Sequence, residues 1–324
     1  MNVAIIGCGG IGRLHAQMVE NCGLRVTACS DTVIRAARSM AMAHKAKAFD
    51  NPLGAIKSKE VDIVAITSPT PTHEKYVVAA AKAGKHIFCE KPFGRSTEEC
   101  KNAIAAAEKA GVKLFVGHVV RYFHEFEAMK TQIQSGAIGE PGWIKLYRGG
   151  IYPGDAKSWF RDYAQSGGVT FDCMIHDLDW VRYVFGEPER IFCQTLMRTE
   201  PTQVDYSQVT MRMKSGVLAT LIGTWAHPSG FRVKAEVCGS DGMVQFSSED
   251  APLSAEARKS GSGPSMIVPM SPVAVSPYQR EWEDFLRWIE GRGEPRVTAR
   301  DAMRAVEMAE AALKSAEKRQ PVKL

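Results

Sequence analysis

The feature that most constrains the fold is a glycine motif near the N-terminus, directly after a short apolar run. Residues 3–6 predict a buried strand, and G-x-G-x-x-G follows at Gly7, Gly9 and Gly12. Glycine here permits a tight turn, close approach of backbone N–H groups to a phosphate, and close helix–strand packing. Between a strand and a helix, the motif predicts a dinucleotide-binding turn. The alternative is a glycine-rich turn that binds no ligand. The expected cofactor contacts in this turn are Gly7, Gly9, Gly10, Ile11 and Gly12.

Asp31 indicates which dinucleotide the turn would bind. It ends the second strand pattern, about 20 residues after the glycines, where an acidic side chain accepts hydrogen bonds from the adenosine ribose. A carboxylate there repels a 2′-phosphate, so the sequence favours NAD over NADP. Arg35 and Arg38 keep NADP open, because either guanidinium could pair with a phosphate. The alternative role of Asp31 is a helix N-cap.

The hydrophobic patterning changes near residue 118. Up to that point strand-like and helix-like segments alternate, as in a doubly wound parallel α/β sheet. Beyond it, long strands with turn signals predict a mostly antiparallel sheet. These strands are expected at 143–148, 190–196, 204–213, 217–225 and 232–238. With 324 residues, the chain is long enough for two domains, which we place at 1–118 and 119–324. A stretch rich in Ser, Pro and Ala at 248–277 predicts a surface loop.

Charge and cysteine content exclude several classes of protein. The net charge of +5 is mild, and no block of Lys and Arg marks a nucleic-acid-binding segment. The sequence contains no apolar run of about 18 residues, so we expect no membrane span, and we recognise no leader peptide. None of the eight cysteines forms a C-x-x-C pair, so a zinc site is not expected. Reduced thiols suit a cytoplasmic protein.

Lys91 is the first candidate catalytic residue. Glu90-Lys91-Pro92 follows the apolar residues 87–89, which predict a strand of the first domain. Ligands of open parallel sheets collect at the carboxyl ends of the strands, which places Lys91 toward the cofactor. Its ammonium could stabilise the oxygen of an alcohol that is being oxidised. A lysine alone is more often a solvated surface charge, so this prediction depends on the other motifs.

Asp172 and His176 form the second candidate. Their spacing of four places both on one face of a helix. A histidine is suited to accept the proton that alcohol oxidation releases near neutral pH, and Asp172 could orient the imidazole. The alternative is an N-cap carboxylate beside a half-buried histidine. Asp177 and Asp179 do not both share the face of His176, so no metal site is expected.

Taken together, these motifs resemble the Gfo/Idh/MocA family of oxidoreductases, nearly from end to end of the chain. The resemblance includes the glycine turn with His15, the Ser68-Pro69-Thr70 segment with His73, Glu90-Lys91-Pro92, and Asp172 with His176 behind Gly167-Gly168. It implies a Rossmann domain followed by an α/β domain with a large, mostly antiparallel, open-faced sheet, which binds substrate and forms oligomers. It also implies oxidation or reduction at a carbon of a sugar, an inositol or a related polyol.

The resemblance also implies roles for individual residues. Lys91 would be the catalytic lysine, and His176 the general acid or base paired with Asp172. The nicotinamide side would be lined by Ser68, Pro69, Thr70, His73 and Glu90. Thr70 stands where many members carry Asn, and Thr32 where many NAD-using members carry Arg. On the substrate side, Trp159 and Arg161 could face the sugar, since aromatic faces and guanidinium forks suit polyols, and the alternative is a loop packed on the sheet. Arg121 and Tyr122, at the start of the second domain, could contact substrate or simply join the domains.

Three functions follow from these expectations. The first is an NAD(P)-dependent dehydrogenase of a sugar or cyclitol hydroxyl. The second is a glycosidase that holds NAD and re-reduces its substrate during bond cleavage. The third is a nucleotide-binding regulator without catalysis, which would not need Lys91, Asp172 and His176 together. An exposed apolar sheet face further predicts a homodimer or homotetramer formed through the C-terminal sheet.

Overall fold

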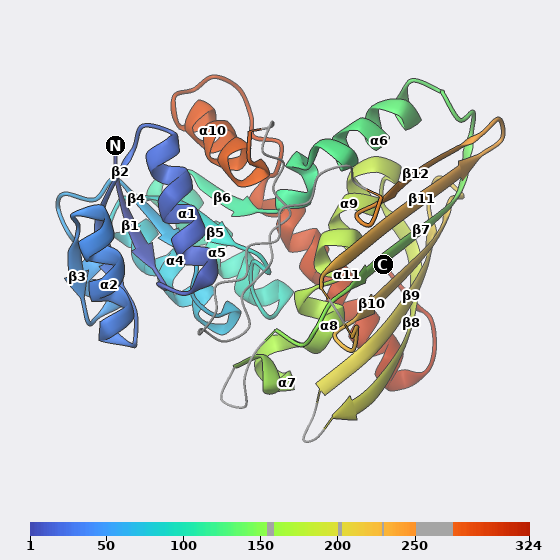
Figure 1. The fold of residues 1–324 in the computed structure, drawn as a ribbon, viewed down its shortest axis with the longest axis horizontal. Coiled ribbons are helices and arrows are strands. Elements are labelled where there is room, and N and C mark those ends of the chain that lie inside the picture. The colour runs from blue at the N-terminus through green and yellow to red at the C-terminus, as the bar shows by residue number, and fades with distance from the viewer. Residues whose placement is uncertain (154–158, 200–202, 229, 251–274) are drawn as a thin grey trace. The chain divides into compact units, whose positions relative to one another are not determined.

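The computed structural model describes residues 1–324 except 154–158, 200–202, 229 and 251–274. The chain forms two compact units (Figure 1). The first comprises residues 1–119 and 275–303, and the second comprises 120–274 and 304–324. Most of the segment predicted as a surface loop, 248–277, lies outside the described residues.

The first unit is built on a parallel sheet of six strands within the described residues, in the order β3-β2-β1-β4-β5-β6. This order reverses direction beside β1, where an open α/β sheet forms its ligand crevice. The strands are β1 (Asn2–Ile6), β2 (Arg25–Ser30), β3 (Lys47–Phe49), β4 (Ile63–Ile66), β5 (His86–Glu90) and β6 (Leu114–Gly117). Strands β1 and β4 are buried almost throughout, as expected for a sheet covered on both faces.

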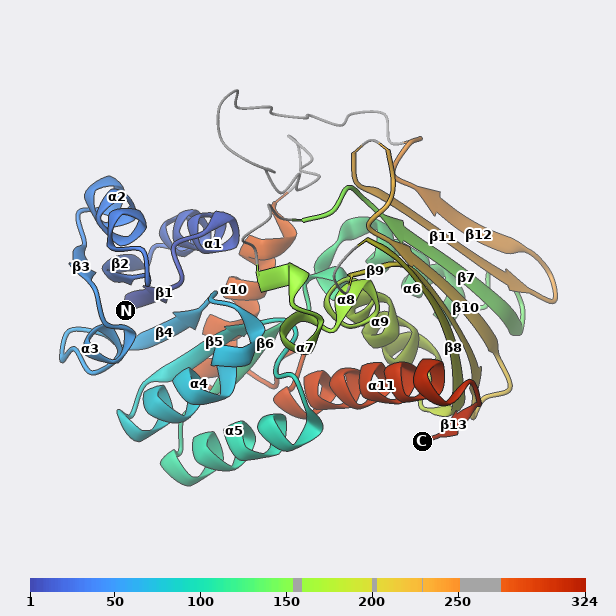
Figure 2. The same cartoon turned by 90° about the horizontal axis from the view of Figure 1, so that it is seen from below.

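Helices cover both faces of this sheet (Figure 2). One face carries α1 (Gly10–Asn21), α2 (Ile34–His44) and α10 (Pro277–Ile289), and the other carries α3 (Pro52–Ile56), α4 (His73–Lys82) and α5 (Thr97–Ala110). Ser96 caps α5 by accepting a hydrogen bond from the backbone N–H of Glu99 at 3.1 Å, as its sequence predicts. The sequence also predicts α1, α2 and α4, but not α3 or β3.

The position of α10 differs from the predicted domain boundaries. The domain predicted at 119–324 includes this helix, whereas the structure groups residues 275–303 with the first unit. The reason is aromatic packing: the ring of Trp282 stacks on Phe88 of β5 at a centroid distance of 4.5 Å, and Phe285 packs against Phe115 of β6 at 5.5 Å. The chain therefore returns to complete the core of the first unit.

The second unit contains a mixed sheet of seven strands in the described residues, in the order β12-β11-β7-β10-β9-β8-β13. All its pairs are antiparallel except β7 with β10. The strands are β7 (Pro141–Gly149), β8 (Pro188–Thr199), β9 (Gln203–Met213), β10 (Leu218–Thr224), β11 (Arg232–Gly239), β12 (Met243–Ser247) and β13 (Val322–Lys323). The mostly antiparallel sheet predicted from the sequence is confirmed.

Within the described residues, helices cover one face of the second sheet and leave the other face open (Figure 2). Polar contacts tie the helices to the strands: Thr170 of α8 bonds to Ser207 of β9 at 2.7 Å, and Ser315 of α11 accepts the backbone N–H of Cys193 in β8 at 3.0 Å. The helices are α6 (His124–Gln134), α7 (Tyr163–Ser166), α8 (Gly168–Asp172), α9 (Ile175–Phe185) and α11 (Ala299–Lys318).

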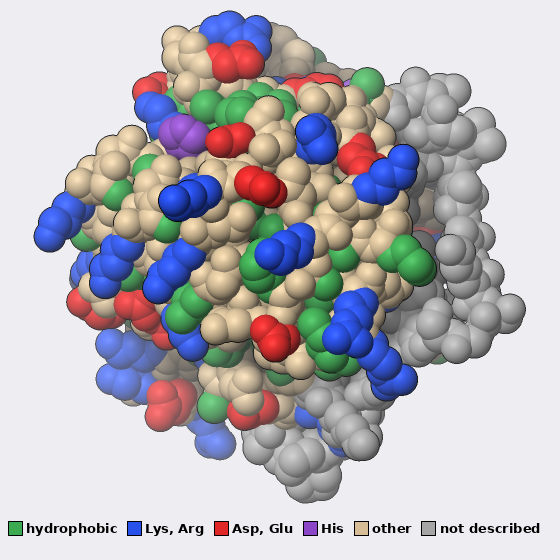
Figure 3. Space-filling view, turned by 90° about the vertical axis from the view of Figure 1, so that its left-hand side faces the viewer, with side chains coloured by type: hydrophobic (Ala, Val, Ile, Leu, Met, Phe, Trp, Pro, Cys, Tyr) green, Lys and Arg blue, Asp and Glu red, His purple; other side chains and the backbone are tan. Residues whose placement is uncertain are grey.

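The surface of the first unit carries charges of both signs. Figure 3 shows the side on which β3 and α2 lie in Figure 1, where Lys and Arg side chains are interspersed with Asp and Glu. This distribution matches the even spread of basic residues along the sequence. Of the helices in the described ranges, none combines the length and apolar character needed to cross a membrane.

Candidate active site

The glycine turn between β1 and α1 is shaped by close backbone contacts. Gly7 has φ +100°, and a Cβ on it would lie 2.7 Å from the backbone of Thr67 and Ser68. A Cβ on Gly12 would overlap the carbonyl oxygen of Gly7. The hydroxyl of Thr67, at the end of β4, donates to the Gly7 carbonyl at 2.7 Å. Packing alone therefore requires glycine at both positions.

Gly9 and Gly10 face open space instead. A Cβ on either residue would meet nothing within 4 Å. Gly9 is the N-cap of α1, and no side chain caps the backbone N–H groups of the first turn. Uncapped N–H groups at a helix N-terminus bind phosphate, and the helix dipole favours the negative charge. The residues present therefore fit a dinucleotide pyrophosphate at this turn.

Asp31 lies beside the same turn. One carboxylate oxygen accepts the backbone N–H of Cys8 at 2.7 Å, and the other accepts that of Val33, the N-cap of α2, at 2.8 Å. The carboxylate is thus held at the glycine turn and supports the start of α2, although Val33 and not Asp31 is the N-cap of that helix. Each oxygen keeps a second lone pair for a ribose hydroxyl. Arg35 and Arg38 are exposed on α2.

The segment after β4 brings Ser68, Pro69, Thr70 and His73 together around a short 3-10 helix, Thr70–Thr72. His73 is fully buried, and its two ring nitrogens lie 2.8 Å from the carbonyl oxygens of Pro92 and Ser68. Burial lowers the pKa of His73. This imidazole therefore connects the segment after β4 to the segment after β5.

At the end of β5, Glu90 is buried and Lys91 is half-buried. One oxygen of Glu90 lies 2.6 Å from His15 Nε2, and the other accepts the backbone N–H of Lys91 at 2.9 Å. Burial alone would raise the pKa of Glu90, but the hydrogen bond from His15 and the charge of Lys91 outweigh it and lower the pKa. The Lys91–Pro92 peptide bond is cis.

Asp172 and His176 do not share one helix. Helix α8 ends at Asp172, and α9 begins at Ile175, with Cys173 and Met174 between them. The prediction that both residues share one face of a single helix is therefore wrong. Asp172 is the last residue of α8, and His176 is the second residue of α9. Asp172 is nearly buried and His176 is half-buried. The spacing of Asp172 and His176 could not reveal that a separate five-residue helix ends between them.

The acidic residues that follow His176 on α9, Asp177 and Asp179, each form a buried ion pair with an arginine. Arg148 binds Asp177 with Nη2 at 2.7 Å, and Arg121 binds Asp179 through two nitrogens at 2.8 and 2.6 Å. Arg121 and Tyr122 thus lie in the interior of the second unit. Both arginines hold α9 by charge-assisted hydrogen bonds. Among the described residues, no group of three or more His, Cys, Asp or Glu side chains could hold a metal ion.

An aromatic cluster adjoins the α8–α9 junction. Its buried members are Val169, Cys173 and Trp225, and Tyr152, Phe160, Tyr163 and Phe231 pack against them. Phe160 packs edge-on against Trp225 at 5.9 Å, which anchors the short 3-10 helix Trp159–Arg161 to the cluster, and Trp159 stacks on Phe160 at 4.3 Å. Tyr152 and Trp225 were not among the site residues expected from the sequence. Their signal is an aromatic side chain just beyond the end of β7 and of β10.

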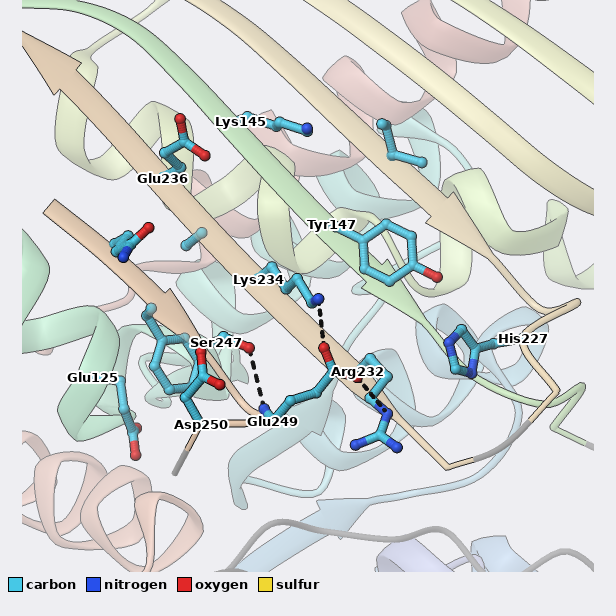
Figure 4. A pocket seen from close by; sticks show the side chains of 14 residues that line it. Glu125, Lys145, Tyr147, His227, Arg232, Lys234, Glu236, Ser247, Glu249 and Asp250 are labelled. Atoms are coloured by element: carbon cyan, nitrogen blue, oxygen red, sulfur yellow. Dashed lines mark hydrogen bonds and ion pairs between the residues drawn. The ribbon is translucent and has the colours of Figure 1, made fainter. Parts of the chain in front are cut away.

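The open face of the second sheet contains a hollow of about 910 Å³ (Figure 4). Its lining mixes charges, and the ammonium of Lys234 forms an ion pair with Glu249. It includes Lys145 and Tyr147 of β7 and Glu236 of β11, and none of the predicted site residues. The hollow is therefore separate from the candidate site residues named above.

Known proteins resemble this chain along its whole length. Residues 1–118 match the oxidoreductase family with an NAD-binding Rossmann fold, and residues 126–245 match the GFO/IDH/MocA C-terminal domain. The chain is 30% identical to the myo-inositol 2-dehydrogenase of Thermotoga maritima, covering 100% of this chain and 98% of that protein. It is also 30% identical to the inositol 2-dehydrogenase of Rhizobium meliloti, covering 98% and 97%.

A solved structure supports the same assignment. The crystal structure of a probable dehydrogenase from Thermotoga maritima matches with a TM-score of 0.86 and 28% identity, covering 100% of this chain and 98% of that one. Neither the glycosidase nor the regulator finds support among these relatives. The chain is an oxidoreductase with a domain of the NAD-binding type. It belongs to the Gfo/Idh/MocA family, as its glycine turn, Lys91, Asp172 and His176 predict.

Proposed function

We propose that this enzyme is an NAD-dependent dehydrogenase that oxidises a hydroxyl group of inositol, or of a related sugar or polyol, to a carbonyl. The observation that carries the proposal is the full-length match to an inositol dehydrogenase by a chain that contains Lys91, Asp172 and His176. Bound NAD would accept the hydride from the carbon that bears the hydroxyl. The protein must then stabilise the oxygen and remove its proton.

We assign these two tasks to three side chains. His176 accepts the hydroxyl proton, since an imidazole is an effective base near neutral pH. Asp172, at the end of α8, orients that imidazole and stabilises it once it is protonated. Lys91 donates a hydrogen bond to the reacting oxygen and stabilises its developing negative charge. Nothing in this scheme requires a metal ion.

The cofactor side follows from the geometry of the first unit. We assign the pyrophosphate to the uncapped first turn of α1 and the adenosine ribose to Asp31. Ser68, Pro69 and Thr70 lie at the end of β4, on the edge of the sheet where ligands of this fold collect. The polar side-chain atoms of Glu90 and His73 form hydrogen bonds within the protein. We assign these two residues to holding the segments after β4 and β5 in place.

For the substrate side, we favour Trp159 and Arg161 over Arg121 and Tyr122. The first two are half-buried on a 3-10 helix anchored to the aromatic cluster beside Asp172. The other two are buried, and the guanidinium of Arg121 is bound to Asp179. An aromatic face and a guanidinium fork suit a polyhydroxylated ring.

The test is NADH formation with a panel of inositols, aldoses and sugar acids, with NAD and NADP run in parallel. We expect turnover of at least one inositol or sugar with NAD, and its loss in Lys91→Ala. Tightly bound NAD without net NADH formation on any member of the panel would contradict the dehydrogenase. It would instead favour a glycosidase or a regulator.

We also propose that the chain forms a homodimer or homotetramer through the open face of the second sheet. Four large apolar side chains are exposed there on strands β8, β9, β10 and β12, namely Leu196, Tyr206, Leu218 and Met243. A second copy would remove this apolar area from water. Leu218→Glu should lower the molar mass measured by light scattering, whereas Met42→Glu, on α2, should not. An unchanged mass in Leu218→Glu would contradict this interface.

A cytoplasmic location remains part of the proposal. All eight cysteines are free thiols, and most are buried. Free thiols persist in a reducing compartment. Fractionation of cells that produce the protein would test the location, and recovery from an oxidising compartment would contradict it.

A further inference from the structure

A chain of buried hydrogen bonds runs from α10 to the backbone of Lys91. The indole Nε1–H of Trp282 donates to His15 Nδ1 at 3.0 Å. His15 Nε2 lies 2.6 Å from one oxygen of Glu90, whose other oxygen accepts the backbone N–H of Lys91 at 2.9 Å. Trp282, His15 and Glu90 are all buried, and all belong to the first unit.

Trp282 determines the direction of these hydrogen bonds. An indole N–H can only donate, so Nδ1 of His15 must be the acceptor and carry no proton. A neutral imidazole then has its proton on Nε2, where it donates to the Glu90 carboxylate. A proton on Nδ1 would face the indole N–H, so the bond from Trp282 disfavours the tautomer that carries its proton there.

Aromatic packing holds this geometry in place. Helices α1 and α10 lie side by side (Figure 1). The ring of Trp282 stacks on Phe88 at 4.5 Å with an interplanar angle of 10°, and the imidazole of His15 packs on the same ring at 4.8 Å. Phe88 stands two residues before Glu90 on β5. The ring of Phe88 therefore supports both the donor and the acceptor of the first hydrogen bond.

We propose that Trp282 is a positioning residue for Lys91, acting by fixing the proton of His15 on Nε2 and thereby the orientation of Glu90. The inference rests on the proposed catalytic function of Lys91. On the other side of Lys91, the carbonyl of Pro92 is held by His73 at 2.8 Å. Hydrogen bonds thus hold the backbone before and after Lys91. They fix the position of its Cα, from which the side chain extends.

The charges around Glu90 are consistent with this arrangement. From α10, burial and the nearby charges of Glu90 and Asp284 raise the pKa of Glu281 well above its usual range, which favours its neutral form. From α4, burial lowers the pKa of His73. Burial also raises the pKa of the adjacent Cys89 thiol. Burial therefore disfavours additional charge around the Glu90 carboxylate.

The first test compares Trp282→Phe with Trp288→Phe. Phenylalanine keeps an aromatic ring against Phe88 and removes the N–H donor together with part of the bicyclic indole ring, and Trp288→Phe makes the same reduction in ring size. Trp288 lies on the same helix, and within the described residues its indole nitrogen has no hydrogen-bond partner, which makes it a matched control. We expect Trp282→Phe to lower kcat about tenfold, the effect of losing one buried hydrogen bond, with the Kd for NAD unchanged. Trp288→Phe should keep both values.

The pH profile separates positioning from a purely structural role. Without the indole donor, Nδ1 of His15 can take up a proton, so kcat of Trp282→Phe should gain an extra decline on the acid side. Nitrogen NMR of the labelled ring should show protonated Nε2 in the wild type. Unchanged kcat and pH profile in Trp282→Phe, or protonated Nδ1 in the wild type, would overturn the proposal.

A double mutant tests whether Trp282 acts through His15. The amide nitrogen of Gln always carries hydrogens, so Gln at position 15 can donate to Glu90 without a neighbour that fixes a tautomer. His15→Gln should therefore keep most of the turnover, and this turnover should not depend on Trp282. Adding Trp282→Phe to His15→Gln should cost less than about twofold, and an undiminished tenfold loss would overturn the pathway through His15. If Lys91→Ala loses activity but Trp282→Phe does not, only the positioning role fails. Full turnover in Lys91→Ala would overturn the function of the lysine itself.

Discussion

The carboxylate of Asp31 accepts the backbone N–H of Cys8 over 2.7 Å, which joins the end of β2 to the glycine turn. The residue proposed to select the cofactor is thereby held against the turn proposed to bind the pyrophosphate. A second hydrogen bond, from the N–H of Val33 at 2.8 Å, fixes the rotation of the carboxylate. The negative charge is therefore held in place before any cofactor binds.

Replacing Asp31 by Asn should change cofactor preference without moving the turn. The amide oxygen still accepts the N–H of Cys8, but the charge that repels a 2′-phosphate is gone. We expect the ratio of kcat/KM for NADP to that for NAD to rise roughly tenfold or more. Asp62→Asn is the control, since Asp62 also accepts a backbone N–H, from Asn2 at 2.8 Å. An unchanged ratio in Asp31→Asn would mean that this carboxylate does not discriminate between the cofactors.

Two glycines of the same turn should respond differently to alanine. In Gly12→Ala the new Cβ overlaps the carbonyl of Gly7, so we expect a loss of about 1–3 kcal/mol of folding stability. In Gly9→Ala the Cβ enters open space, so thermal unfolding should be unchanged while the Kd for NAD rises. Thermal denaturation and NAD titration of both variants would check this. Unaltered NAD binding by Gly9→Ala would place the pyrophosphate elsewhere.

Elements with strong local signals were predictable from the sequence. The strand before the glycine turn and the helix after it are confirmed as β1 and α1, and Ser96 caps α5 as expected. The carboxylate of Glu99 adds a hydrogen bond from the backbone N–H of Arg95 at 2.7 Å, just before this helix. Short segments such as β3 carry too few residues to show a period.

What the sequence could not show depends on contacts between distant residues. His15 and Trp282 are 267 positions apart, and no local pattern indicates that α10 returns to the first sheet. The motif around His15 gives no sign of its hydrogen bond to Glu90. Likewise, the spacing of Asp172 and His176 does not reveal that a helix ends between them, because both segments have helical periodicity.

Lys91→Ala should remove most of the turnover and leave NAD binding intact. The side chain is proposed to stabilise charge on the reacting oxygen, so its loss should lower kcat by about a hundred- to a thousandfold. Lys82→Ala, at an exposed position of α4, is the control for removing one positive charge. The measurement is steady-state NADH formation together with NAD titration. Normal kcat in Lys91→Ala would exclude the lysine from the chemical step.

His176→Asn should remove the decline of kcat/KM on the acid side of neutral pH. In the wild type, protonation of the proposed base stops it from accepting the hydroxyl proton, so activity falls as pH decreases. The variant should be slower and insensitive to pH in that range. His44→Asn, on α2, serves as the control, because its imidazole binds Glu20 at 2.8 Å. If the decline persists in His176→Asn, a different group acts as the base.

Glu281 should make the enzyme less stable as pH rises. This carboxyl on α10 is fully buried, and within the described residues neither oxygen has a hydrogen-bond partner. Burial, together with the nearby charges of Glu90 and Asp284, raises its pKa well above the ordinary glutamate value of 4.5. Between 4.5 and the raised folded-state pKa, the folded protein holds a proton that the unfolded chain has lost. The free energy of unfolding therefore falls by up to about 1.4 kcal/mol per pH unit in that window.

Glu281→Gln removes this dependence, because a neutral amide has no proton to take up. We expect the variant to unfold at a higher temperature than the wild type near neutral pH. The gain should shrink as pH falls toward 4.5, where the wild-type carboxyl is protonated in both states. Glu283→Gln, exposed on the same helix, should show no such trend. Unfolding curves across this pH range decide the matter, since a gain independent of pH would mean that Glu281 is not buried as a neutral acid.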